Sequence, residues 1–376
     1  MERMHVARTR PIVVVGGGII GLLTARELAM AGHEVCLFEQ GAVGREASWA
    51  AGGILSPLHP WRYPDAVTRL AQASVALYPA LCSGLAAATG IDPEWLPSGL
   101  LRLDLEEAQA AMSWAGRFGV PLESRDLADV CPGRGLSGPG LWMPDIAQVR
   151  SPRLMQALAA ALRSLKVTIH EQASVEGFTH ARERVTGLVA NGEMVAASRV
   201  VVCAGAWSQP LLARYGLALP VRPMRGQMIV IQTPPGLLRP MILSATRYLV
   251  PRRDGAVLVG STMEDVGFVK ETTDAGREDL LKAAHAIMPG LSAHPVTHHW
   301  AGLRPSSPEG IPYIGEHPEI RGLVVNTGHF RNGIVLAPAS ARLAADLILG
   351  RDSTLDPAPY TLDRVSAGGA DGTVLK

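Results

Sequence analysis

A glycine-rich turn between two buried strands is the feature that most limits what this chain can fold into. Residues 11–15 (PIVVV) are typical of a strand buried on both faces, and residues 16–21 read GGGIIG. Apolar residues then recur at helical spacing up to Gly32, and a second strand is predicted at 34–39. This order of elements predicts a βαβ unit with the G-x-G-x-x-G spacing of a dinucleotide-binding turn.

Each part of this unit has a physical role toward a dinucleotide. Gly16 allows the tight turn out of the strand, Gly18 lets a pyrophosphate approach the backbone, and Gly21 lets helix and strand pack closely. The helix N-terminus offers free N–H groups to the phosphates, and Glu39 stands where an acid that binds an adenosine ribose is expected. A plain turn, with Glu39 as a solvated carboxylate, is the alternative. The agreement of all the parts favours dinucleotide binding, without distinguishing NAD from FAD.

Strand character changes along the rest of the chain. Buried parallel-type strands are predicted at the start, at 199–204 and at 322–326, whereas the strands between 221 and 263 alternate as antiparallel strands do. Helices are predicted at 66–90, 151–165, 277–288 and 334–349, and a hairpin around 191–192. We therefore predict a mixed α/β fold, in which a Rossmann-like cofactor-binding domain carries an inserted, mainly antiparallel substrate domain. The predicted cofactor domain comprises residues 1–85, 151–220 and 301–365, the substrate domain residues 86–150 and 221–300, and a flexible tail residues 366–376.

Composition excludes several other classes of protein. Lys and Arg number 35 against 34 Asp and Glu, a net charge of +1 that argues against nucleic-acid binding and against a polybasic grip on membranes. The most apolar run, 12–25, is short and broken by glycines, so no membrane span is predicted, and the first ten residues do not read as a signal peptide. The four cysteines are scattered, which predicts neither a metal site nor a redox pair and fits a reducing cytoplasm.

Seven segments together carry a family likeness. They are residues 13–21 (VVVGGGIIG), Glu39, 46–57 (EASWAAGGILSP), 204–208 (AGAWS), 300–305 (WAGLRP), 310–315 (GIPYIG) and 328–334 (GHFRNGI). In this order, across nearly the whole chain, the sequence resembles the glycine oxidase branch of the FAD-dependent D-amino-acid oxidase family. The residues alone leave 44–54 open between a second ligand contact and a small-residue packing helix.

The resemblance implies non-covalent FAD, since related sarcosine oxidases anchor flavin through a cysteine and this chain has none between 204 and 376. With the glycine turn, it places the following residues around FAD: Gly16, Gly18, Ile19, Ile20, Gly21, Glu39, Gln40, Ala47, Ser48, Gly52, Gly53, Ile54, Val175, Gly205, His329, Phe330, Arg331, Asn332, Gly333, Ile334 and Val335. It also suggests a homotetramer.

Amino-acid chemistry points to Arg304. A substrate carboxylate needs a bidentate partner that aims the Cα–H at flavin N5, and a guanidinium matches two carboxylate oxygens. Arg304 follows an apolar strand and precedes Pro305, and the family likeness agrees; a buried ion pair is the alternative. Tyr248 is expected to hydrogen-bond the same carboxylate or to be a core residue, Arg331 to assist, and Met263 to limit side-chain size or to be core.

The expected reaction is hydride transfer from Cα to flavin N5, followed by hydrolysis of the imine to a 2-oxo acid and ammonia, with H₂O₂ formed from O₂. Glycine, sarcosine, D-alanine and D-proline are the candidate substrates, and the imine of glycine has a possible use in thiamine thiazole biosynthesis. Two alternatives stay open: a dehydrogenase that passes electrons to a quinone, and a non-catalytic dinucleotide-binding protein. A metal site at His294, His298 and His299 is not favoured, because adjacent strand residues face opposite sides.

Overall fold

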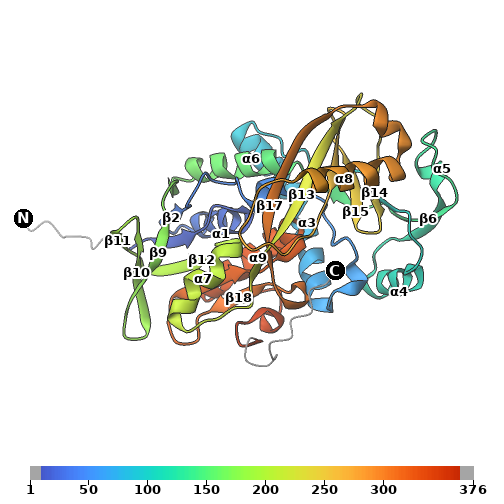
Figure 1. The fold of residues 1–376 in the computed structure, drawn as a ribbon. Helices are drawn as coiled ribbons and strands as arrows, with labels where there is room; N and C mark the ends of the chain where they lie inside the picture. The colour runs from blue at the N-terminus through green and yellow to red at the C-terminus, as the bar shows by residue number, and fades with distance from the viewer. Residues whose placement is uncertain (1–9, 365–376) are drawn as a thin grey trace, which may run out of the picture.

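The computed structural model describes residues 10–364 and has two main β-sheets (Figure 1). The first is six-stranded, in the order β18-β19-β12-β1-β2-β8, and all its pairings are parallel except that of β18 with β19. Its strands are β1 Ile12–Val15, β2 Val35–Phe38, β8 Thr168–His170, β12 Arg199–Val202, β18 Tyr313–Glu316 and β19 Leu323–Thr327. Segments far apart in the chain therefore meet in one sheet, as a Rossmann-like domain requires.

Both faces of this sheet are covered, which explains the unbroken apolar run of β1. Ile12 and Val14 join one apolar cluster with the helices α1 Ile19–Met30, α3 Asp65–Thr89, α6 Ser151–Ser164 and α9 Gly333–Leu349. Val13 and Val15 join a second cluster on the other face, with a three-stranded sheet formed by β9 Val175–Ala181, β10 Arg184–Ala190 and β11 Glu193–Ala196. The short helix α7 Ser208–Leu212 lies on this side as well.

The second main sheet has eight strands, in the order β17-β13-β16-β15-β14-β4-β6-β5. Its strands are β4 Leu100–Arg102, β5 Glu123–Asp126, β6 Pro139–Met143, β13 Arg222–Gln232, β14 Met241–Ser244, β15 Arg247–Pro251, β16 Ala256–Gly260 and β17 Val296–Ser306. All neighbours pair antiparallel except β4 with β14. The helix α8 Asp274–Ile287 packs on one face, and α4 Ala108–Phe118 contributes to the cluster on the other.

The mixed α/β fold class predicted from the sequence is confirmed, and the differences are local. The strands β9, β14 and β18 and the helix α7 were not predicted. The segment 91–150, to which no element was assigned, contains β3 Leu96–Pro97, β4, β5, β6, β7 Ala147–Gln148, α4 and α5 Leu127–Val130, and the helix α2 Ala47–Ala50 lies in the segment left open between a ligand contact and a packing helix. The domain boundary predicted at residue 301 falls inside β17, and the whole of that strand belongs to the eight-stranded sheet. The predicted tail, 366–376, lies outside the described residues.

Two helices, α3 and α9, are long and apolar enough to cross a membrane by length and composition alone, which the sequence analysis did not predict. They pack against each other inside the cofactor-domain core, where Tyr78 of α3 donates to the carbonyl of Ile334. Ser74 of α3 donates to the carbonyl of Leu336 and accepts from the amide of Ala339. These contacts bury most of α9, whereas α3 is buried along one face.

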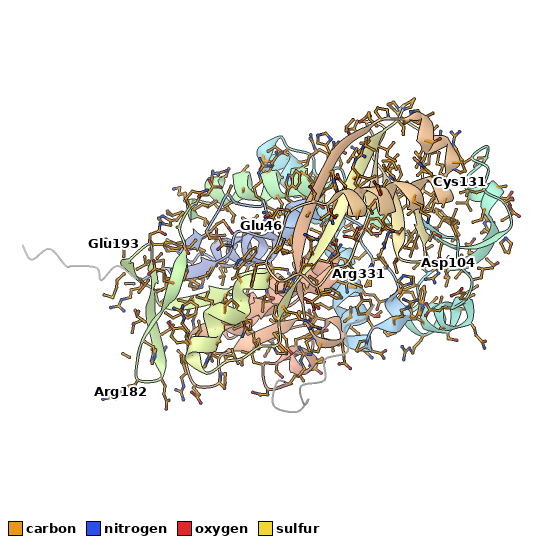
Figure 2. The ribbon with its side chains drawn as sticks, viewed as in Figure 1. Glu46, Asp104, Cys131, Arg182, Glu193 and Arg331 are labelled. Carbon is orange, nitrogen blue, oxygen red and sulfur yellow. The ribbon has the colours of Figure 1, made fainter. Side chains whose placement is uncertain are left out.

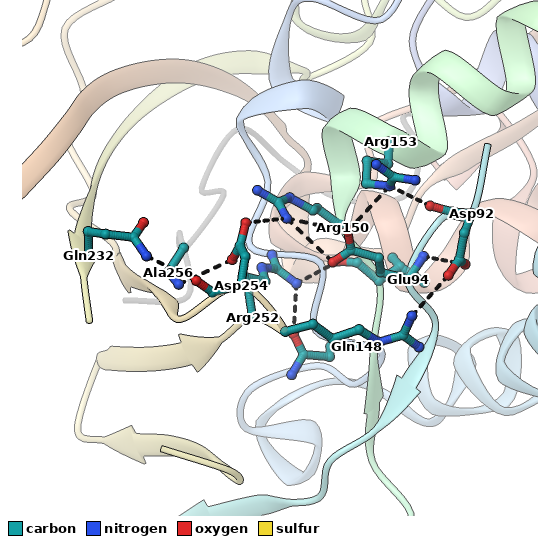
Figure 3. A network of polar contacts seen from close by, with 11 residues as sticks. Asp92, Glu94, Gln148, Arg150, Arg153, Gln232, Arg252, Asp254 and Ala256 are labelled. Atoms are coloured by element: carbon teal, nitrogen blue, oxygen red, sulfur yellow. Dashed lines mark hydrogen bonds and ion pairs between the residues drawn. The ribbon is translucent and has the colours of Figure 1, made fainter. Parts of the chain in front are cut away.

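A half-buried arginine joins the two sheet-bearing halves (Figure 3). The guanidinium of Arg252, just after β15, donates to the Gln148 side chain at 2.7 Å and to the backbone carbonyls of Val149 at 2.9 Å and Gly52 at 2.8 Å. Burial lowers the pKa of Arg252 to about 10, so it stays charged at neutral pH. Near this contact, Arg150 forms ion pairs with Glu94 and Asp254.

Replacing Arg252 by Met removes the donor and leaves buried carbonyls without a partner. We expect the free energy of unfolding to fall by about 2–4 kcal/mol, because hydrogen bonds from a charged donor are each worth roughly 1.5–3 kcal/mol and orphaned acceptors carry their own penalty. Chemical denaturation measures the change. Arg253→Met is the matched control, since the exposed neighbouring pair with Asp92 should contribute about 0–1 kcal/mol. Equal losses in the two variants would contradict this role for Arg252.

Candidate active site

A cavity of about 570 Å³ runs from the glycine turn after β1 to the edge of the eight-stranded sheet. Most of the residues proposed from the sequence line it: Gly16, Gly18, Ile19, Ile20, Glu39, Gln40, Ala47, Ser48, Gly52, Val175, Gly205, Tyr248, Arg304, His329, Phe330, Arg331, Gly333 and Ile334. Gly21, Gly53, Ile54, Met263, Asn332 and Val335 are not among the lining residues. The segments brought together come from both main sheets, and Figure 2 shows Arg331 between them.

The glycine turn has the packing expected of it. A Cβ on Gly16, whose φ is 108°, would overlap the carbonyl of Cys203 in the loop after β12, and one on Gly21 would overlap the carbonyl of Gly16. Gly21 is therefore a packing glycine, which explains why it does not line the cavity. Gly18 does line the cavity, and the amide of Ile19 at the start of α1 donates to Ser48 Oγ at 2.9 Å.

Glu39 is buried at the end of β2, with 7% of its surface exposed, and lines the cavity. One carboxylate oxygen accepts from the amide of Gly17 at 2.7 Å and the other from the amide of Gly41 at 2.9 Å. The carboxylate thus also holds the turn in shape, a structural role that the sequence did not reveal. Its contact with a ribose stays a prediction, for which each oxygen keeps a free lone pair.

The segment 47–52 combines the two roles that the sequence left open. Ala50 packs so closely on Gly302 of β17 that a Cβ there would come within 2.7 Å of the Ala50 methyl group, and Gly52 lies against the Tyr248 ring. Ala47, Ser48 and Gly52 also line the cavity. Small residues are required here because the backbone lies between the cavity and the eight-stranded sheet, with no room for larger side chains.

At the far end of the cavity, Arg304 lies over Gly226 of β13, where a Cβ would overlap its guanidinium. One nitrogen, Nη1, donates to the carbonyls of Thr262 at 3.1 Å and Arg225 at 3.4 Å. Burial lowers the pKa of Arg304 to about 10, and the charge of Arg331 contributes to this shift. Among residues 10–364, neither Arg304 nor Arg331 forms a salt bridge. This end of the cavity is therefore suited to an anion.

Tyr248 of β15 stands beside this pair of cations. Its ring lies against Gly52 and Gly260, and its hydroxyl has one hydrogen-bond partner among the described residues, the Met228 sulfur at 3.8 Å. A thioether is a weak acceptor, so the hydroxyl gains by donating to a carboxylate instead.

Several lining residues were missed by the sequence analysis: Glu46, Trp207, Pro210, Leu211, Arg214, Gly226, Met228, Gly302 and Thr327. Met228 shares the alternating face of β13 with Gly226, which was the available signal. Met263 is half-buried outside the lining, so its role as a pocket wall stays a prediction.

The adjacent histidines of β17 have different surroundings, as neighbouring residues of a strand do. His298 is exposed beside Thr297, whereas His299 faces Gln227 at 3.1 Å. Within residues 10–364, no group of three or more His, Cys, Asp or Glu side chains is arranged to hold a metal ion.

Fold and cavity define a Rossmann-type, dinucleotide-dependent enzyme whose cavity ends at an anion site. A family model described as FAD dependent oxidoreductase matches residues 11–347, and the chain belongs to this family, with FAD as its cofactor. The residues present fit this cofactor: the glycine turn leaves room along the backbone, and the amide-rich start of α1 faces a cavity long enough to continue to the anion site.

The relatives agree with this assignment. A glycine oxidase from Pseudomonas putida is 48% identical over 94% of this chain and 98% of its own length. A crystal structure of glycine oxidase from Geobacillus kaustophilus superposes with a TM-score of 0.88 at 33% identity, covering 95% of this chain and 99% of that one. A bifunctional protein ThiO/ThiG from Trichormus variabilis is 35% identical over 92% of this chain and 53% of its own length.

Gly18 provides a test of the phosphate approach. In Gly18→Ala the new methyl group would meet Ser48 Oγ at 3.1 Å and occupy space next to the backbone. We expect the Kd for FAD to rise roughly tenfold or more, because the backbone can no longer approach the pyrophosphate closely. Fluorescence titration of apoprotein with FAD measures it. Gly84→Ala, where a Cβ meets nothing within 4 Å, is the control. An unchanged Kd in Gly18→Ala would argue against this mode of binding.

Proposed function

We propose that this FAD-dependent amino-acid oxidase acts on glycine and on small amines such as sarcosine, D-alanine and D-proline. The observation that carries the proposal is the pair of cavity-lining arginines, Arg304 and Arg331, which form no salt bridge among the described residues. With glycine, O₂ and water, the products are glyoxylate, ammonia and H₂O₂. The Pseudomonas and Geobacillus relatives named glycine oxidase support this substrate class.

The chain's own residues would bind and orient the substrate. Arg304 keeps donors that are not engaged by the carbonyls of Thr262 and Arg225, so its planar fork can hold a carboxylate by two oxygens. Tyr248 would donate its hydroxyl to the same carboxylate, and Arg331 adds positive charge at the amine or carboxylate end. Holding the carboxylate by two oxygens fixes the direction of the bond to the α-carbon and so the place of that carbon in the cavity.

FAD, when bound, would supply the hydride acceptor and pass the electrons of the amine on to O₂. A strong general base is not needed if the amine binds in its neutral form. His329, a titratable residue on the cavity wall, cannot serve as a cationic acid near neutral pH, because burial lowers its pKa to about 3. The protein's contribution is therefore mainly binding and orientation.

We propose four further properties of this protein. The segregation of strands between two sheets supports the discontinuous division into cofactor and substrate domains, with β17 assigned to the substrate domain. The family resemblance supports a homotetramer, and the dispersed cysteines support a cytoplasmic location. Relatives named ThiO/ThiG support the use of the imine of glycine in thiamine thiazole biosynthesis.

Oxygen uptake separates oxidase from dehydrogenase. Glycine, sarcosine or D-proline should cause O₂ consumption with matching H₂O₂, and anaerobic glycine should bleach the flavin spectrum. Dye reduction without oxygen uptake would favour a quinone-linked dehydrogenase. A flavin spectrum that none of these amines bleaches would favour a non-catalytic protein.

Arg304→Ala tests the carboxylate site. We expect KM for every carboxylate substrate to rise roughly ten- to a hundredfold, because a charge-assisted pair worth roughly 1.5–3 kcal/mol is lost. Initial rates of oxygen uptake measure KM. Arg222→Ala is the control, because that exposed arginine at the end of β13 pairs with Asp265. A KM that stays at the value of the unmodified enzyme would refute the assignment of Arg304.

Tyr248→Phe should cost less than Arg304→Ala. The variant loses one hydrogen bond of about 1 kcal/mol, which corresponds to a KM increase of about fivefold. The packing of the ring on Gly52 and Gly260 is preserved. The same oxygen-uptake assay applies. Complete loss of turnover in Tyr248→Phe would mean that the hydroxyl does more than bind the carboxylate.

A further inference from the structure

A chain of buried polar side chains reaches the cavity from behind, through His329. This residue lies between β19 and α9, has 2% of its surface exposed, and lines the cavity. Its Nε2 is 2.7 Å from Ser340 Oγ of α9, and Ser340 Oγ is 2.8 Å from Asn326 Oδ1 of β19. None of these contacts belongs to the roles derived above.

The direction of each hydrogen bond in this chain can be deduced. The carbonyl of Ser340 can only accept, and it lies 3.2 Å from Asn326 Nδ2, so this carbonyl fixes the orientation of the Asn326 amide. Asn326 Oδ1 must then accept, and the single hydroxyl proton of Ser340 goes to it. Ser340 Oγ has no proton left for His329, so His329 Nε2 carries the hydrogen and donates it.

The other ring nitrogen of His329 is consequently an acceptor. Burial lowers the pKa of His329 to about 3, so the ring is neutral and Nδ1 carries no proton. No described residue forms a hydrogen bond with Nδ1. Fully enclosed side-chain atoms that lack a partner occur in Thr24, Ser151, Arg225 and Asn332, and Nδ1 of His329 is not one of them. Nδ1 is therefore open to the cavity that the ring lines.

We propose that His329 binds FAD as a fixed hydrogen-bond acceptor, with Nδ1 facing an N–H or O–H group of the cofactor. Its tautomer is set by Ser340, which lies outside the cavity lining, and by Asn326, which also lines the cavity. The proposal concerns cofactor binding, and it holds or fails independently of which amine is oxidised. Two pieces of the fold are required for it, since Asn326 lies in β19 and Ser340 lies in α9.

Two substitutions of His329 separate the two ring nitrogens. The amide of Gln places a polar atom near the position of Nε2 and can still reach Ser340, whereas the amide of Asn places its polar atoms near the position of Nδ1. We expect the Kd for FAD to rise about five- to tenfold in His329→Gln, because one hydrogen bond to the cofactor is lost. The rise should be smaller in His329→Asn, which keeps a polar atom near the position of Nδ1. A purely structural role would give the reverse order, because only Gln preserves the contact with Ser340.

Ser340→Ala tests the control of the tautomer without altering the cavity wall. Removing the hydroxyl leaves Nε2–H without an acceptor, which favours moving the proton to Nδ1 and turns the acceptor into a donor. We expect a rise in the Kd for FAD comparable to that of His329→Gln. Ser74→Ala is the matched control, a buried serine that also binds α9 backbone but lies outside the cavity lining, and its Kd should stay within about twofold.

The measurements are the Kd for FAD by fluorescence titration, the flavin absorbance spectrum, and ¹⁵N chemical shifts of labelled histidine, with His329→Gln identifying the His329 signals. Support requires an unprotonated Nδ1 in the unmodified protein and Kd values in the order given. A protonated Nδ1, a Kd in His329→Gln equal to that of the unmodified protein, or equal Kd values in Ser340→Ala and Ser74→Ala would overturn the proposal. A change confined to KM for glycine would also overturn it, since the acceptor would then face the substrate.

Discussion

The ladder between β13 and β17 is the interaction on which the active site depends. It runs from the pair of Arg222 with Ser306 to that of Ile231 with Val296, which makes these two strands a long, stiff edge of the substrate sheet. Along it, Gly302 meets Ala50 of the cofactor domain, and Arg304 is set over Gly226. The same ladder thus brings the anion site to the cofactor cavity and fixes their separation.

Three arginines near this junction show how partners decide what a cation does. Arg252 donates to three neutral acceptors, and these hydrogen bonds stabilise its charge where the two sheet-bearing halves meet. Arg304 is only partly engaged, by two carbonyls, and Arg331 forms no salt bridge among residues 10–364. A buried charge without an opposite charge is costly, so unpaired cations lining a cavity are best explained by an anionic ligand.

Residues 268 and 270, in the segment between β16 and α8, contact residues that line the cavity. Phe268 packs on the ring of Trp207 with centroids 5.6 Å apart, and Lys270 pairs with Glu46 at 2.9 Å. Trp207 and Glu46 both line the cavity. The contacts are partly exposed, so they add little stability on their own.

The sequence by itself determined the parts that depend on local spacing. The glycine turn, the strand that ends in Glu39, the mixed fold class and many of the cavity residues followed from periodicity, from glycines without a Cβ, and from the family likeness of short segments. Strand β14 and the full length of β17 were missed, because strand ends are set by pairing with distant neighbours and not by the strand's own residues.

Only the tertiary structure decided what each polar group contacts. It gave Glu39 a second role in holding the turn, and it linked His329 to Ser340 and Asn326. The physical reason is that hydrogen bonds and burial depend on which segments meet in space. The residues concerned lie far apart in the chain, so no spacing in the sequence records those contacts.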